Sequence, residues 1–204
     1  MRVPKIVDHD ARRSLIIEAL WRAVARDGAS AVSVRSVAAE AGVSRSGMAY
    51  YFKSHGQLLA MAIEEMVVSV TDEIMSIDVL NCDVDVATDA LLAMVPDTPM
   101  RRRQSRLWLL LMAQADESPD VSEVLHQLNK SVRAGIHDIL HALVNSQLVS
   151  LDRDLEVEAA TLHALIDGLS ALSLTDLKLA RQTSTRLILR QVISGLALPM
   201  NVNA

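Results

Sequence analysis

The residues best suited to a chemical task are concentrated between positions 44 and 55. This stretch combines cations, small hydroxyls, a glycine and two phenols, namely Arg45, Ser46, Gly47, Tyr50, Tyr51 and Lys53. Cations, hydroxyls and phenols bind phosphate oxygens, and a glycine lets another backbone approach closely. The set therefore suits the surface of a nucleic acid better than it suits bond-making chemistry.

Signals for catalysis are weak elsewhere in the chain. There is no Gly-rich phosphate loop and no nucleophile elbow, and the single cysteine, Cys82, has no evident partner in the sequence. His137 and His141 stand one helical turn apart and could share a metal ion, but no third ligand stands out. We therefore predict that the chain is not an enzyme and holds no metal or cofactor.

Two short helices must position the residues at 44–55. Residues 34–41 place Val34, Val37, Ala38 and Ala41 on one face, behind a capping Ser33, and Gly42 suits the positive φ at a helix end. Ser44 caps a second helix that runs to about Tyr51. Two short helices joined by a turn with glycine form a helix-turn-helix, here residues 33–52.

Three finer expectations follow from this motif. The third residue of the first helix is Ser36 rather than Glu or Gln, so we expect a simple serine cap and no capping box. Of the adjacent Tyr50 and Tyr51, we expect one to be mainly a core residue. The N-terminal end of the second helix is expected to face base edges and phosphates.

Charge supports this interpretation only when the chain is divided. The whole chain carries a formal net charge of −5, yet residues 1–57 hold nine Lys/Arg against five Asp/Glu. The remaining residues hold eleven Lys/Arg against twenty Asp/Glu. A basic head on an acidic body is typical of a DNA-binding protein that carries a second, different domain.

Helical periodicity extends over the rest of the chain. We predict an all-α fold of about nine helices, with a DNA-binding head at residues 9–69 and a larger ligand-binding and dimerisation domain at 70–204. A long helix at 55–77 is expected to join them. The longest apolar run, Leu107–Ala113, is far shorter than the roughly 20 residues that span a bilayer, so we expect a cytoplasmic protein without a membrane partner.

Residues 12–69 resemble the N-terminal domain of the TetR (tetracycline-repressor-like) family of regulators. The resemblance is carried by R-D-G at 26–28, S-V-R-S-V-A at 33–38, A-G-V-S at 41–44, Y-F-K-S at 51–54 and L-L at 58–59. It implies DNA contacts at Ser33, Arg35, Ser44, Arg45, Ser46, Gly47, Tyr50, Tyr51 and Lys53. Many members have Tyr where this chain has Ala49, and Lys where it has His55. We include His55 as a weaker or pH-sensitive phosphate contact.

Two later segments, residues 106–121 and 162–174, resemble the C-terminal domain of the subgroup named for the regulator of betaine synthesis. This resemblance concerns the fold and does not make choline or betaine the ligand. Choline recognition favours an aromatic cage, and after residue 52 the chain has a single aromatic residue, Trp108. We therefore do not expect a quaternary ammonium ligand in this domain.

A helix at 155–174 is apolar on two sides and must be covered on both. One stripe is built from small residues, Ala160, Ala164, Gly168 and Ala171. The last helix offers Ile188, Leu189, Val192, Ile193 and Leu196. We predict that these two helices form a four-helix homodimer interface; the alternative is a helix fully buried within a monomer.

A pocket for an unknown small-molecule effector is expected among the middle helices. Candidate lining residues are Met66, Met75, Met94, Trp108, Met112, His126 and Leu162, with His163 and Asp167 as polar anchors. The alternative is that all of these are ordinary core residues. The predicted function is a regulator, by family default a repressor, that binds a palindromic double-stranded operator as a dimer. A helical ligand carrier is the second hypothesis, but it would have no use for Arg45, Tyr50 and Lys53 on one exposed face.

Overall fold

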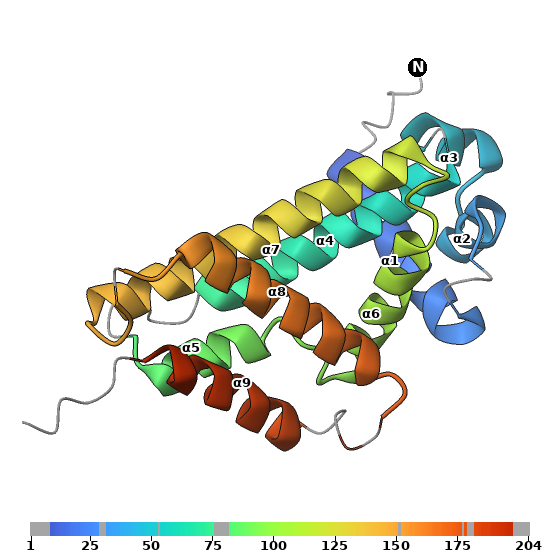
Figure 1. Cartoon of the computed structure of the whole chain (residues 1–204). Helices are drawn as coiled ribbons and strands as arrows, with labels where there is room; N and C mark the ends of the chain where they lie inside the picture. The colour runs from blue at the N-terminus through green and yellow to red at the C-terminus, as the bar shows by residue number, and fades with distance from the viewer. Residues whose placement is uncertain are drawn as a thin grey trace, which may run out of the picture. The chain divides into compact units, whose positions relative to one another are not determined.

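The computed structural model describes residues 9–28, 32–52, 54–75, 82–150, 152–176, 178 and 182–197 (Figure 1). Over these residues the secondary structure is helical, apart from an isolated antiparallel bridge between Val149 and Ala197. The helices are α1 (His9–Asp27), α2 (Val34–Ala41), α3 (Arg45–Tyr51), α4 (His55–Met75), α5 (Val84–Leu92), α6 (Pro99–Met112), α7 (Pro119–Asn145), α8 (Leu155–Leu172) and α9 (Gln182–Leu196). For the residues that the structure describes, the predicted all-α fold of about nine helices is confirmed.

Side-chain caps explain why helices α5 and α8 begin where they do. Asp83 accepts hydrogen bonds from the backbone N–H groups of Asp85 and Val86 at the start of α5, at 2.9 and 2.8 Å. Asp154 does the same at the start of α8. These carboxylates satisfy N–H groups that have no partner within the helix and also favour its positive end.

The described chain forms two compact units. Unit 1 extends to Glu65 and includes Leu107–Leu125, and unit 2 comprises Met66–Arg106 together with the residues from His126 onward. The predicted boundary after residue 69 placed all of 107–125 in the second domain. The contacts of the structure group this segment with unit 1, where Val121 and Ser118 lie against Gly56 and Asp120 accepts a hydrogen bond from Ser54, and the domain boundary stays a prediction.

The core of unit 1 is built on one face of α1. Ile16, Leu20 and Ala23 of α1 are fully buried, as are Val37 of α2 and Met48 of α3. The four- and three-residue spacing of the α1 residues places them along a single stripe, which packs against α2. Burial of this stripe together with Val37 and Met48 holds α1, α2 and α3 together as one body.

The core of unit 2 is formed by α5, the later part of α7, α8 and α9. Its fully buried residues include Leu91, Ile139, Leu140 and Leu189, and Leu162 is almost fully buried. Helix α5 packs against α9, and Asp85 on α5 pairs with Arg186 and Arg190 on α9 at 3.2 and 3.0 Å. None of the described helices is long and apolar enough to cross a membrane.

Candidate nucleic-acid interface

The first short helix of the predicted motif, α2, is tied to α1 by one carboxylate. Glu40 on α2 accepts from Arg22 at 3.0 Å and from Arg26 at 2.5 Å, both on α1. These bonds lower the pKa of Glu40 below its ordinary value, and the bond from Arg26 has the larger effect. The sequence motif did not predict these two ion pairs, because residues 14 and 18 positions apart are not neighbours on one helix.

A full capping box opens α2, so the expectation of a simple cap was wrong. Ser33 Oγ accepts from the backbone N–H of Ser36 at 3.1 Å, and Ser36 Oγ accepts from the backbone N–H of Ser33 at 2.9 Å. The usual Glu or Gln reaches back with a longer side chain. Here the serine hydroxyl at the third helical residue is close enough to complete the same reciprocal pair.

The turn between the helices has the geometry that the sequence predicts. Gly42 has φ of 62°, in the left-handed region that favours glycine. The backbone N–H of Val43 donates to the carbonyl of Ala38 at 2.9 Å and closes the end of α2. Val43 is buried, which anchors the turn between the two helices.

Ser44 opens α3, the helix that the motif predicts as the recognition helix. Its Oγ accepts from the backbone N–H of Gly47 at 3.1 Å and lies 3.1 Å from the Oγ of Ser46. A Cβ at Gly47 would come within 2.9 Å of a methyl group of Val43. Gly47 is therefore needed for packing of the turn against α3, whatever its role toward DNA.

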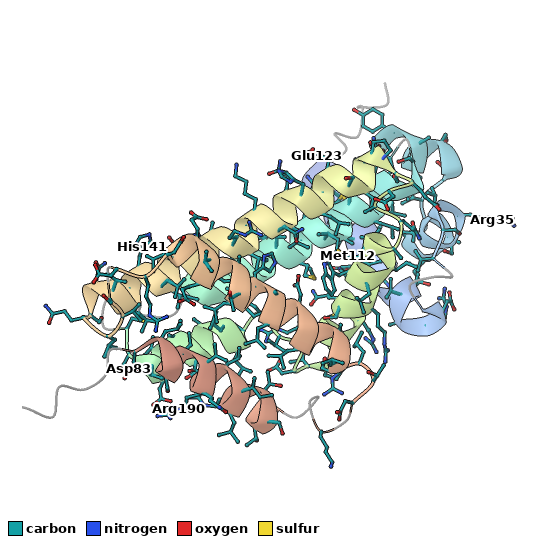
Figure 2. The ribbon with its side chains drawn as sticks, in the orientation of Figure 1. Arg35, Asp83, Met112, Glu123, His141 and Arg190 are labelled. Atoms are coloured by element: carbon teal, nitrogen blue, oxygen red, sulfur yellow. The ribbon has the colours of Figure 1, made fainter. Side chains whose placement is uncertain are left out.

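Much of the exposed surface of the motif is polar. Ser33, Ser44, Ser46 and Arg35 are exposed, and Figure 2 shows Arg35 extending away from α2. Tyr50 is 73% exposed. Tyr51 is half-buried and meets the ring of Tyr50 edge-on, with centroids 5.2 Å apart. The structure thus distinguishes the two phenols, and Tyr50 is the one that is open to a partner.

Part of the predicted contact set lies outside what the structure describes. Lys53 falls outside the described residues, and the side chains of Arg45 and His55 do as well. Ser33, Arg35, Ser44, Ser46, Gly47, Tyr50 and Tyr51 are all described within α2, α3 and their caps.

The predicted effector residues are spread over both units. Trp108 and Met112 belong to unit 1, whereas Met66, Met94, His126, Leu162, His163 and Asp167 belong to unit 2; the side chain of Met75 lies outside the described part. Met112 is 45% exposed and His126 is exposed, while Leu162 is almost fully buried. His163 Nε2 lies 3.7 Å from Asp167 Oδ2, one turn apart on α8.

Among the predicted dimer residues, those on α9 divide into two groups. Leu189, Ile193 and Leu196 are buried in the core of unit 2, at 0, 1 and 7% exposure. This corrects the assignment of these three to a partner surface, because their apolar surface is already covered by their own unit. Ala160 and Ala164 are exposed, whereas Gly168, Ala171, Ile188 and Val192 are partly exposed.

Comparisons with known proteins agree with this architecture. The profile described as "Bacterial regulatory proteins, tetR family" matches residues 16–62, and that described as "BetI-type transcriptional repressor, C-terminal" matches residues 84–197. The HTH-type transcriptional regulator PksA of Bacillus subtilis (strain 168) is 31% identical over 194 residues, covering 94% of this chain and 93% of PksA.

Solved structures resemble the chain over nearly its whole length. A TetR-family transcriptional regulator from Rhodococcus sp. superposes with a TM-score of 0.78 at 25% identity, over 93% of this chain and 100% of its own. A transcriptional regulator from Saccharomonospora viridis, solved in complex with choline, gives a TM-score of 0.75 at 24% identity, over 93% and 99%.

The helix-turn-helix, the C-terminal profile and the full-length relative all indicate the same class of protein, and that class is not enzymatic. The chain belongs to the TetR family of DNA-binding transcriptional regulators, with a C-terminal domain of the BetI type.

Proposed function

We propose that this regulator is a repressor that binds a palindromic operator as a homodimer and leaves it when a small-molecule effector binds unit 2. The observation that carries the proposal is the exposed polar surface of α2 and α3. Arg35, Ser46 and Tyr50 are exposed on a motif whose internal packing comes from Val37, Met48 and the Glu40 ion pairs. A repressor that acts by occupying a promoter needs only such a DNA-binding surface, because the bound protein itself blocks the polymerase.

The homodimer is supported by the outer face of α8. Ala160 and Ala164 are exposed there, and Val157 and Leu172 are 59 and 52% exposed. Leu187 of α9 is 64% exposed. Small side chains interspersed with exposed aliphatic ones allow a partner helix to approach closely and bury apolar area. Two heads about 34 Å apart would then meet successive major grooves of a palindrome.

The effector is proposed to lie in unit 2, with His163 and Asp167 as polar anchors. The choline complex of the S. viridis protein makes a quaternary ammonium the obvious comparison. Unit 2 has no aromatic residue in this sequence, and Trp108, the one aromatic after residue 52, belongs to unit 1 and is 8% exposed. A cage of aromatic faces, which choline recognition favours, is therefore not available within unit 2. We propose a different, mainly apolar effector there.

The DNA-binding surface is tested by selecting genomic fragments bound by the protein and measuring the affinity of the best site by fluorescence anisotropy. Arg35→Ala should weaken operator binding by about 1 kcal/mol or more. It should also lower the slope of log Kd against log salt concentration by about 1, because one phosphate contact is lost. Arg133→Ala, which removes an exposed arginine of α7 in unit 2, is the matched control and should leave both quantities unchanged.

Equal affinity and salt slope for Arg35→Ala and the native protein would remove Arg35 from the interface. The repressor assignment has a separate readout, transcription from the selected promoter in a purified system. Activation of transcription there, in place of inhibition, would contradict it.

A further inference from the structure

A stripe of polar side chains runs along α8 in unit 2, on its buried side. His163, Asp167 and Ser170 follow one another at intervals of four and three residues, so they lie on one face of the helix. His163 and Ser170 are 6 and 7% exposed, and the side chain of Asp167 is 40% exposed. Burial removes the water that would otherwise bond to such groups, so buried polar side chains normally have hydrogen-bond partners within the protein.

Two other buried hydroxyl groups of unit 2 have such partners, whereas the stripe does not. Thr88 Oγ1 donates to the carbonyl four residues before it at 2.6 Å, and Ser173 Oγ donates to the carbonyl of Ser170 at 2.9 Å. The Ser170 hydroxyl and the His163 ring form no hydrogen bond with any residue that the structure describes. His163 Nε2 is 3.7 Å from Asp167 Oδ2, which is too far for a hydrogen bond. The stripe therefore has unused hydrogen-bonding capacity at two deeply buried positions.

The residues of α8 beside the stripe are apolar. Leu162, Ile166 and Leu169 are 1, 2 and 5% exposed and belong to the core of unit 2. Burial also raises the pKa of Asp167, as expected for a carboxylate next to apolar surroundings. A ligand along the stripe must therefore be mainly apolar, with polar groups only where it meets the stripe.

The spacing and chemistry of the stripe define the polar groups of such a ligand. Ser170 follows His163 by seven residues, which is a rise of about 10 Å along the helix. An ionised carboxylate only accepts hydrogen bonds, whereas an imidazole can donate or accept. A ligand hydroxyl, which does both, can therefore bond to Asp167 and His163 together. At Ser170 a second hydroxyl or a carbonyl oxygen can pair with the serine hydroxyl.

We propose that the effector of unit 2 is an elongated, uncharged and mainly apolar molecule that carries two oxygen functions about 10 Å apart. One is a hydroxyl that binds between His163 and Asp167, and the other is a hydroxyl or carbonyl oxygen that bonds to Ser170. Ser170 is thus a third polar anchor, in addition to the two that the sequence predicts. The inference rests on the effector function proposed above and names the chemical class of the effector.

The test uses the full-length protein and calorimetric titration with 4,4′-biphenol, a rigid uncharged molecule with hydroxyl groups at its two ends. The comparison ligand is 4-phenylphenol, which has the same body and lacks one hydroxyl. Biphenol should bind about threefold to tenfold more tightly, because it forms one further hydrogen bond with a buried group. Ser170→Ala should leave biphenol only the advantage of its two equivalent ends and should not change the affinity for 4-phenylphenol. Asp167→Asn should weaken the binding of both.

Thr88→Val is the matched control, because it removes a buried hydroxyl of unit 2 that is already bonded within its own helix. It should leave the ratio of the two affinities as in the native protein. Without ligand, Ser170→Ala should melt no lower than the native protein, since the hydroxyl that it removes has no hydrogen bond to lose. A lower melting temperature would assign the hydroxyl to the structure and overturn the proposal. An unchanged affinity ratio in Ser170→Ala, or no binding of biphenol to the native protein, would overturn it as well.

Operator affinity measured on the same samples distinguishes this proposal from the effector function on which it rests. Biphenol that binds in the expected pattern but does not release the operator would support the ligand class and contradict the effector role of unit 2. Release of the operator by both phenols with no dependence on Ser170 would support the effector role and contradict the ligand class.

Discussion

Ser36 shows how a short side chain completes a motif that is usually written with longer ones. It accepts from the backbone N–H of Ser33 and donates to the carbonyl of the same residue, both at 2.9 Å. Ser36→Ala should remove both bonds and lower the free energy of unfolding by about 0.5–1 kcal/mol. Chemical denaturation measures this loss. A variant as stable as the native protein would show that water replaces the hydroxyl without cost.

The prediction for Asp167 concerns a half-buried carboxylate on α8. Burial raises its pKa above the ordinary value of 3.8, and His163 at 3.7 Å opposes this only in part. A folded-state pKa above the unfolded one means that the carboxylate costs stability once the pH exceeds 3.8, and that this cost grows until the pH passes the folded pKa. Asp167→Asn should therefore stabilise the protein at neutral pH.

The gain from Asp167→Asn should be about 0.5 kcal/mol, since the side chain is 40% exposed and water screens its charge. Urea denaturation at about pH 4 and about pH 8 should show a smaller gain at the lower pH. The same gain at both pH values would assign the effect to packing rather than to charge. Loss of effector response in this variant would in addition support Asp167 as a ligand anchor.

At the scale of the elements, helix positions were predictable because their signals are local. Asp83 and Asp154 cap α5 and α8 through bonds to residues two and three positions away, and Gly42 ends α2 through its own backbone conformation. The sequence also predicted the apolar faces of the motif. It did not show which of Tyr50 and Tyr51 is the less exposed, because that depends on how α3 packs against elements distant in the sequence.

A groove of about 730 Å³ on the surface of unit 1 could not be predicted from the sequence for the same reason. Arg13, Gln57 and Glu123 come together only through the packing of α1, α4 and α7. The assignment of Leu189, Ile193 and Leu196 to a dimer surface failed similarly. A helix with apolar residues on a broad face does not reveal which of them its own core covers.

The tie between α1 and α2 can be tested as a unit through Glu40. Glu40→Gln keeps the shape but removes the charge that pairs with Arg22 and Arg26. The pKa of Glu40 is lowered from its ordinary value of 4.5, so the pair stabilises the folded state above that pH and is lost as the pH falls through the folded pKa. The variant should melt at a lower temperature than the native protein at neutral pH, and the difference should shrink toward about pH 3.

Operator affinity should fall with this variant too, since α2 and α3 depend on α1 for their position. Glu18→Gln, which removes an exposed acidic partner of Arg22 within α1, is the control and should change neither melting nor DNA binding appreciably. A Glu40→Gln melting difference that is independent of pH would contradict the role given to the charge.

For the whole molecule, the uneven distribution of charge agrees with DNA binding by the N-terminal part alone. A basic N-terminal region and an acidic remainder direct the protein to DNA through one part only. The C-terminal part is the part to which we assign the proposed effector site and the proposed dimer contact. The proposed dimer on α8 is what turns a weak single head into a specific regulator, because two half-sites are read together.

Gly168 allows the dimer to be tested apart from folding. A Cβ built at this position meets nothing within 4 Å in the subunit, so Gly168→Leu should be accommodated. Leucine in place of glycine within a helix favours folding by up to about 1 kcal/mol. In a close α8–α8 contact, however, the new side chain would hold the partner helices apart. Sedimentation should show a folded monomer with far weaker operator binding, whereas Ser131→Leu on exposed α7 should remain a dimer. A dimeric Gly168→Leu protein would place the interface elsewhere.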